Sequence, residues 1–307
     1  MAGGVIGTGN IARLLEEGVN DVWGRDYNEH NIQWDKLFKE HDSDRAYELD
    51  VQMEGFSPAP VKPQGQGVVY DSAMEGFIPK YVMQSIAKGF EVTKEAYDDN
   101  QYDLFEKGAG DLALSFRQTE EIIGADVYNR ASNVAYTMEG GDGKPFSATD
   151  HPLGPTDTGT YSNVLAVGAA LSEASVEAIL IQINQAVDAR GNRVAIKGTQ
   201  LVVPAQLQFQ ADRVLKSPLQ SGGATNDINA IMNTGMLPQG YCVNNFLTNA
   251  TRFFIRTDCP NGAKRFTRES MDFERDRDFN TSNFRFQGFE RYAYGWTNAR
   301  TTYANGL

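Results

Sequence analysis

Apolar side chains recur at spacings of three and four, or multiples of these, across residues 101–132, with charged side chains between them. The apolar positions are Phe105, Ala109, Leu112, Phe116, Ile123 and Val127. This period predicts one amphipathic helix, which at about 1.5 Å per residue would be a rod on the order of 45 Å long. Gly108, Gly110 and Gly124 each weaken a helix by about 1 kcal/mol relative to alanine. We therefore expect contacts with the rest of the chain to hold the rod straight, or kinks at these glycines.

A compact α/β unit is predicted further along the chain. Ser172 can cap the free amides of a helix, and Gly191 is of the residue type that ends one. The apolar stripe of this helix is formed by Val176, Ile179, Leu180, Ile183 and Val187. Residues 201–203 read as a short buried strand, and Pro204 begins a further helix, where its missing N–H does no harm.

Strand signals dominate the C-terminal third and one segment before the long helix. Alternating aromatic residues cover 284–296, and shorter apolar runs cover 241–246 and 253–256. The Asn-Gly pair at 261–262 is typical of a tight hairpin turn. Residues 77–93 read as extended chain, because apolar and polar residues alternate at their C-terminal end.

The first 60 residues show no sustained helical or strand period. Their aromatic side chains are scattered among charges, at Trp23, Tyr27, Trp34, Phe38, Tyr47 and Phe56. Such a segment cannot bury its aromatics against itself, so we interpret it as an arm that lies on another surface, with short helices near 11–19 and 33–41. Residues 58–67 are rich in Pro, Gly and Gln, which predicts the start of a projecting, hairpin-like loop that ends near residue 100.

Composition excludes wholesale disorder. The 307 residues carry 28 Lys and Arg against 40 Asp and Glu, a net charge of −12, and 41% are hydrophobic, so the chain can bury a core in one or two domains. No run of about 18 apolar residues predicts a membrane span, and no leader peptide is visible. Two cysteines make no disulfide framework, which favours a reducing compartment. The negative charge argues against a sequence-reading nucleic-acid binder, because phosphate affinity comes mainly from Lys and Arg.

Motifs that carry chemistry are weak. The Gly-Thr-Gly at residues 7–9 resembles a dinucleotide-binding turn, but the strands that such a turn needs before and after it are missing. His30, His41 and His151 have no metal-binding spacing. Asp150 beside His151 could be the base half of a hydrolase, yet no nucleophile is marked.

The acidic alternation of residues 272–278 resembles a calcium loop, but arginines interrupt it and the turn glycine is missing. An ion-pair strip is the better interpretation. We therefore predict no catalytic, cofactor-binding or metal-binding residues, and no enzyme activity.

In its order of segments the chain resembles a tailed-bacteriophage major capsid protein of the Hong Kong 97-type fold, and it is similar to the Mu-like major head subunit family. The resemblance covers most of the chain. It is carried by residues 89–102 before the long helix, by 201–204 at the start of the α/β unit, and by 289–296, followed by Arg300 and Tyr303. None of these stretches is a catalytic signature; their order and spacing make the match.

The resemblance implies an α+β fold of five segments. These are an N-terminal arm (1–60), an extended β-hairpin called the E-loop (61–100), a peripheral domain with a spine helix (101–160), an axial α/β domain (161–271) and return strands of the peripheral domain (272–307). Some family members crosslink a Lys of the E-loop to an Asn of a neighbouring subunit. Lys62 and Lys80 are candidates by residue type only, so we do not assign that activity.

The resemblance further implies a subunit that self-assembles into pentamers and hexamers of an icosahedral head shell around double-stranded phage DNA, without sequence-specific binding, cofactor or metal. Its partners would be further copies, a portal protein at one vertex, and possible scaffolding and decoration proteins. It would be made in the host bacterial cytoplasm and end in the virion. Two alternatives stay open: the shell subunit of an encapsulin-type nanocompartment, and a nicotinamide-dependent oxidoreductase built on residues 7–9.

Overall fold

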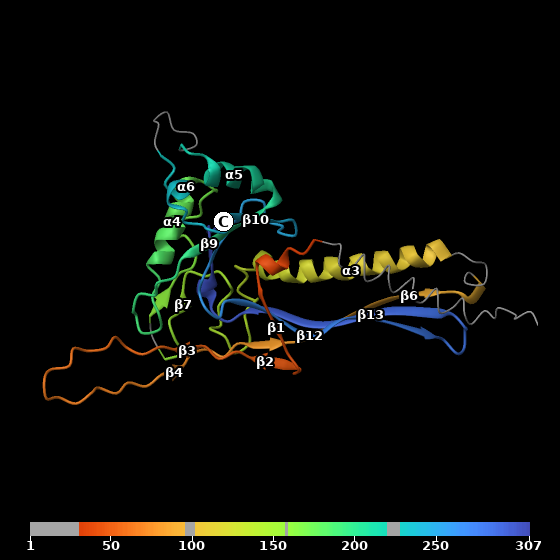
Figure 1. The fold of residues 1–307 in the computed structure, drawn as a ribbon, viewed down its shortest axis with the longest axis horizontal. Coiled ribbons are helices and arrows are strands. Elements are labelled where there is room, and N and C mark those ends of the chain that lie inside the picture. Colours follow the sequence, from red (N-terminus) through yellow and green to blue (C-terminus); the bar gives the residue numbers. More distant parts are fainter. Residues whose placement is uncertain (1–30, 96–101, 157–158, 220–227) are drawn as a thin grey trace, which may run out of the picture.

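The computed structural model describes residues 31–95, 102–156, 159–219 and 228–307. Within these ranges the chain forms two four-stranded sheets, a long helix and a loop that projects away from the body (Figure 1). The α+β class predicted from the sequence is confirmed.

The first sheet forms the peripheral part of the molecule. Its strands, in spatial order, are β1 (Lys39–Asp42), β12 (Ala263–Arg277), β13 (Phe284–Trp296) and β6 (Gln84–Val92). β12 and β13 form a long antiparallel pair, β6 is antiparallel to β13, and β1 is parallel to β12. Helix α3 (Tyr102–Asn129) runs along this sheet (Figure 1) and is continuous across its three glycines, which confirms the predicted long helix.

Helix α3 and the sheet enclose the peripheral core. The buried members of this core are Ala109, Leu112, Ala113 and Phe116 of the helix, and Phe284 and Phe286 of β13. Gly288 of β13 lies beneath Phe116: a Cβ at this position would be 2.7 Å from Phe116 Cε2 and would also collide with the end of Met271. Glycine is therefore required where the helix comes this close to the strand.

The second sheet and its helices form what we call the axial part. The strands, in spatial order, are β10 (Tyr241–Asn244), β9 (Gly198–Pro204), β11 (Phe254–Thr257) and β14 (Thr302–Ala304). The helices are α4 (Glu173–Asn184), α5 (Gln208–Lys216) and α6 (Ala230–Thr234), with single 3₁₀ turns η2 (Ala205–Leu207) and η3 (Ala299–Thr301). Leu201 and Val203 pack with the helices on one face, and Val202 packs into a second cluster on the other. The predicted buried strand is confirmed.

Helix α4 begins where Ser172 predicts. Ser172 Oγ accepts the Ser175 N–H at 3.2 Å and Ser175 Oγ accepts the Ser172 N–H at 2.9 Å, so two free amides are satisfied reciprocally. The predicted end at Gly191 is wrong: the helix ends at Asn184, and Gly191 takes a φ of 77° in a later turn. Pro204 ends β9 and precedes η2 rather than opening a helix, and α5 starts only after that turn.

The C-terminal end of α3 joins the two parts. Tyr128 is fully buried, and its ring makes edge-to-face contacts with those of Phe38, Phe146 and Phe254 at centroid distances of 5.8, 5.4 and 5.1 Å. Phe254 belongs to the axial sheet, whereas Phe38 precedes the first strand of the peripheral sheet. One aromatic cluster, whose pairs stabilise beyond simple area burial, therefore closes the junction.

The end of the segment expected to be an arm belongs to the body. Trp34 and Phe38 are only 5% and 3% exposed, and the chain here forms η1 (Trp34–Lys36) and β1 rather than the helix expected near 33–41. The interpretation as an arm is wrong for these two aromatics, because they are buried in one core cluster with residues of α3 and β13 of the same chain. Residues 1–30, including the helix expected near 11–19, lie outside the described residues.

The projecting loop lies earlier in the chain than predicted. At its root, β2 (Tyr47–Leu49) pairs with β5 (Lys80–Val82) and β3 (Met53–Glu54) pairs with β4 (Met74–Glu75), both antiparallel. Beyond β3 and β4, residues 55–73 leave the body without strand pairing (Figure 1). The predicted loop at 61–100 extends too far toward the C-terminus. Residues 84–92 form β6 in the peripheral sheet.

The structure also differs from the expected turn at 261–262 and from the expected segment boundary at 271–272. The Asn-Gly pair at 261–262 does not close a hairpin, although Asn261 takes the left-handed φ of 54°. It joins β11 of the axial sheet to β12 of the peripheral sheet. The boundary expected between residues 271 and 272 falls inside β12, and β14 near the C-terminus lies in the axial sheet. The division into five segments stays a prediction, with limits that differ from these element boundaries.

We predict that Gly288→Ala weakens the subunit, because the new methyl group overlaps the buried ring of Phe116. Overpacking of this kind costs about 1–3 kcal/mol, and urea denaturation of the unassembled full-length subunit measures it. Gly67→Ala is the matched control, since nothing lies within 4 Å of a Cβ there. Equal stabilities of the two variants would contradict the close approach of helix and strand.

Candidate functional site

His151 lies in a buried polar cluster between the two parts of the molecule. It belongs to β7 (His151–Pro152), which pairs with β8 (Thr160–Tyr161). The side chain is fully buried, its Nδ1 lies 2.5 Å from Asp142 Oδ2, and its ring stacks on that of Tyr161 at 5.1 Å. Asp150, which the sequence sets beside it, pairs instead with Lys144 on the surface. The suggested Asp150–His151 base is therefore wrong.

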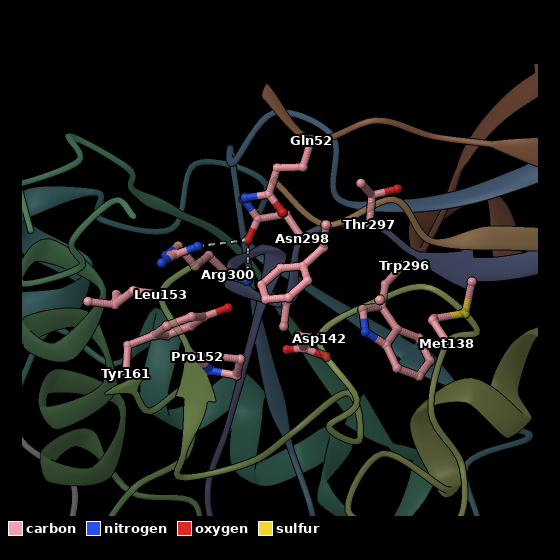
Figure 2. A pocket seen from close by; sticks show the side chains of 13 residues that line it. Gln52, Met138, Asp142, Pro152, Leu153, Tyr161, Trp296, Thr297, Asn298 and Arg300 are labelled. Atoms are coloured by element: carbon pink, nitrogen blue, oxygen red, sulfur yellow. Dashed lines mark hydrogen bonds between the residues drawn. The ribbon is translucent and has the colours of Figure 1, made fainter. Parts of the chain in front are cut away.

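Arg300 completes this cluster. Its guanidinium carbon lies 3.8 Å from the centre of the Tyr161 ring, and its backbone N–H donates to Asn298 Oδ1 at 3.0 Å. Figure 2 shows Arg300, Tyr161 and Asp142 around a pocket, and the free space inside it is only about 10 Å³. That is about the space that one water molecule needs, so the pocket has no room for a substrate. The cluster joins the β7–β8 ribbon to the C-terminal residues.

The other chemical candidates do not gather into a site. Residues 7–9 and His30 lie outside the described ranges, and His41 stacks on a phenylalanine ring of β12. Burial raises the pKa of both free thiols, Cys242 and Cys259, to about 11, so neither is an activated nucleophile. Across the described ranges, His, Cys, Asp and Glu side chains form no group of three that could hold a metal. Nor does any helix in those ranges have the length and apolar character to cross a membrane.

The acidic strip at 272–278 is engaged with neighbouring side chains. Asp278 pairs with Arg285 of β13, and Glu274 accepts a hydrogen bond from Gln287 at 3.1 Å. The Asp278–Arg285 pair supports the ion-pair interpretation at the end of the strip, whereas the contact of Glu274 is a hydrogen bond from a neutral amide.

A buried charge cluster ties the N-terminal segment to α3. Arg265 of β12 is 5% exposed and pairs with Glu120 of α3 at 2.5 Å and with Glu40 of β1 at 3.0 Å. Its guanidinium carbon also lies 4.0 Å from the centre of the Trp34 ring. One arginine of β12 therefore bonds α3 and β1 through charge-assisted hydrogen bonds of the strong class, and it stacks on a ring of η1.

Glu290 of β13 lies in the same region and is only 1% exposed. Burial away from water is the main reason that its pKa rises to about 8; the charge of Glu120 raises it further, and Arg265 opposes the rise. Glu290 is therefore protonated at neutral pH, which lowers the number of negative charges under α3.

The extended segment of residues 47–54, which contains β2 and β3, presents apolar side chains to solvent and polar side chains to the body. We call it the inverted segment. We call the apolar set the apolar stripe; its members are between 38% and 61% exposed, and they are Tyr47, Leu49, Val51, Met53 and, on β5 opposite Tyr47, Val82. The alternate residues are at least partly buried, and they are Glu48, Asp50, Gln52 and Glu54. Asp50 Oδ2, for example, lies 2.5 Å from Lys264 Nζ. A sheet with one solvated face normally shows the opposite pattern, so the stripe is suited to contact with another molecule.

The projecting loop continues this exposed surface. Every residue from 55 to 73 is exposed. Its large apolar members are between 63% and 95% exposed, and they are Phe56, Val61, Val68, Val69 and Tyr70. Of the two lysines considered for crosslinking, Lys62 lies in this loop, whereas Lys80 lies in β5 and pairs with Glu139 at 3.0 Å. Monomeric proteins rarely expose apolar patches larger than a few hundred Å², so loop and stripe mark a binding surface.

The sequence holds a signal for this surface that the interpretation of residues 1–60 as aperiodic misses. Residues 47–54 alternate strictly as Tyr-Glu-Leu-Asp-Val-Gln-Met-Glu, which is a strand period. The pattern alone does not say which face lies inward, and the usual assumption would bury the apolar side chains.

The fold defines the class of protein. A long helix along a peripheral sheet, a separate axial sheet and a projecting loop make a subunit of the Hong Kong 97 type. The chain belongs to the phage capsid protein family, whose model matches residues 78–305. Comparison with curated proteins found no match. The expected closer similarity to Mu-like head subunits stays a prediction.

Solved structures share this fold at low sequence identity. A chain from the capsid of a native GTA particle has a TM-score of 0.56 and 11% identity, over 88% of each chain. A virus-like particle from Pyrococcus furiosus gives 0.52 and 10%, over 94% of this chain and 97% of that one. Mycobacterium phage Patience gives 0.52 and 8%, over 95% and 86%. The fold is thus kept where almost no sequence is shared.

We predict that Glu290→Gln makes the subunit more stable at high pH. A carboxyl whose pKa rises on folding stabilises the folded state below the unfolded value near 4.5, and that contribution is lost as the pH rises through about 8. Glutamine mimics the protonated form at every pH. The variant's gain in unfolding free energy should therefore grow by about 1–4 kcal/mol between pH 5 and pH 9, as measured by urea denaturation at both values.

Glu274→Gln is the matched control, because this carboxyl lies exposed on the adjacent strand. This variant should lack the large gain expected for Glu290→Gln at high pH. A gain for Glu290→Gln that does not change with pH would show that the Glu290 carboxyl is not protonated in the folded subunit.

Proposed function

We propose that the protein is the major capsid protein of a tailed bacteriophage, which self-assembles into pentamers and hexamers of an icosahedral head shell. Membership of the phage capsid family supports this, and so does the α+β fold. The observation that carries the proposal is the inverted segment at residues 47–54, which turns the apolar stripe outward and continues into the exposed loop.

A second copy of the chain is the partner that this surface fits. The loop projects far from the body (Figure 1), so the surface that it contacts belongs to another molecule. When one patch on a subunit contacts a different patch on the next, the contact repeats and closes into rings. Covering the apolar side chains gives the association its main favourable free energy.

The shell would enclose double-stranded DNA without reading its sequence. The net charge of −12 leaves little general attraction for phosphates, so the packaged polymer would not adhere to the wall. A portal protein at one vertex and, in some systems, scaffolding or decoration proteins would complete the particle. The chain would be made in the host cytoplasm and end in the virion.

The same proposal gives the protein no catalytic role. The support is that His151 is buried in a filled junction and that both thiols have raised pKa values.

We predict that replacing Val61, Val68, Val69 and Tyr70 together by serine blocks shell formation and leaves the subunit folded. These side chains are exposed in the subunit, so its melting temperature should stay within a few degrees of the wild type. The protein concentration needed for assembly should rise at least tenfold, because each factor of ten costs only about 1.4 kcal/mol and one fully buried valine contributes about 1.5 kcal/mol or more. Sedimentation velocity and negative-stain microscopy measure this.

Val134→Ser with Val167→Ser is the matched control, since these residues are 82% and 79% exposed but lie outside the loop and the stripe. The control should form normal particles. If the loop variant formed normal particles, the proposed contact between the loop and a second copy would be wrong. Particles that hold protein cargo in place of DNA would favour the nanocompartment alternative.

A further inference from the structure

The projecting loop is tied to the axial part through one arginine. Arg190 lies in the turn after α4, and its guanidinium donates to three groups of the loop. Nη1 donates to Ser57 Oγ at 2.7 Å and to Asp71 Oδ2 at 2.9 Å, and Nη2 donates to the Ser72 carbonyl at 2.6 Å. Ser57 lies on the outgoing side of the loop, and Asp71 and Ser72 on the returning side. One side chain therefore holds both sides of the loop at its root.

Asp71 closes the root from within the loop. Its Oδ2 accepts the Ser57 backbone N–H at 2.7 Å, and its Oδ1 accepts the Ser72 N–H at 2.8 Å. The Ser57 amide is the largest cause that lowers the pKa of Asp71 to about 2, and the Ser72 amide and Arg190 add to it. Asp71 is therefore charged at any physiological pH. We call these four residues, Ser57, Asp71, Ser72 and Arg190, the root clamp.

The turn that carries Arg190 is itself well held. Asp188 Oδ1 accepts the backbone N–H of Arg190 at 2.9 Å and that of Asn192 at 2.8 Å. Gly191 supplies the left-handed φ of 77° that this turn needs. The side chain of Arg190 is only 16% exposed. The guanidinium thus starts from a fixed backbone and loses little freedom when it bonds the loop.

Behind the clamp, the loop root does not pack tightly on the axial part. A cavity of about 130 Å³ separates them, lined by Gln52, Met53 and Gly55 of the root and by Ala189, Val194 and Cys259 of the axial part. Such a space has room for water, so the two surfaces are not in full apolar contact here. Beyond the clamp the described loop residues form no strand pairs. Along with the β3–β4 pairing at the root, the directional, charge-assisted hydrogen bonds of the clamp therefore help to set the angle of the loop.

We propose that Arg190 is a positioning residue for assembly: the root clamp holds the projecting loop at one angle to the axial part, so that its apolar side chains meet a neighbouring copy in the productive orientation. This inference rests on the proposed contact between the loop and a second copy. Ordering the loop before contact lowers the entropy that association must overcome. Loss of the clamp should slow assembly without unfolding the subunit.

The test compares Arg190→Gln with Lys197→Gln. Lys197 is an exposed cation of the same axial part, so its variant removes the same charge without touching the loop. Hydrogen exchange of the unassembled full-length subunit reports the loop directly, through the amides of Ser57 and Ser72. Light scattering and negative-stain microscopy report assembly. Arg190→Lys keeps the charge but loses the forked geometry, and serves as the milder variant if the glutamine variant does not fold.

We expect Arg190→Gln to speed exchange in residues 55–73 and to slow assembly at least tenfold, with an unchanged melting temperature. Lys197→Gln should change none of these, and Arg190→Lys should be intermediate. Unchanged exchange in both Arg190 variants would overturn the clamp. Faster exchange with normal assembly would overturn the positioning role, while the proposed loop contact would still stand if the serine variant of the loop fails to assemble.

Discussion

The rest of the structure depends on the packing of the C-terminal end of α3 between the two sheets. Tyr128 contacts rings from the N-terminal segment, from the loop after α3 and from the axial sheet, and it has no exposed surface. Because interiors are close-packed, a change in the position of this end of the helix must be transmitted to both sheets. The chain itself passes between the two sheets at the turn at 261–262 and again through η3 between β13 and β14.

The inverted segment at residues 47–54 uses its two faces in different ways. Its polar face is satisfied by the body: Asp50 pairs with Lys264, and Glu48 accepts a hydrogen bond from Ser43. Its apolar face lacks cover within the described subunit. In the proposed assembly, folding and association would use opposite faces of the same segment, so a substitution on the outer face would change assembly with little effect on the fold.

The sequence predicts elements whose contacts are local and misses features that depend on distant partners. The periodicity of α3 and the Ser172 cap are local, and both predictions are confirmed. Trp34 belongs to the segment interpreted as an arm, yet it stacks under Arg265, more than two hundred positions away. The Asn-Gly pair at 261–262 has the expected left-handed backbone, but the strands on either side join different sheets. The sequence therefore predicts the backbone conformation at this turn, but it does not predict which strands pair on either side.

The candidate surface follows the same division. Strict alternation in residues 47–54 marks a strand, but the direction of its apolar side depends on Lys264 and other residues of the body. The root clamp was beyond prediction, because Arg190 and Asp71 lie 119 positions apart and neither belongs to a recognisable motif.

The exposed loop has a consequence for the lifetime of the chain in a cell. Proteases bind extended, accessible backbone, and segments of this kind are the preferred places for cleavage. Residues 55–73 offer such a backbone in a lone subunit, whereas a neighbour that covers the loop would hide it. Incorporation into a shell would then also protect the loop from proteases, and unassembled copies would be degraded first.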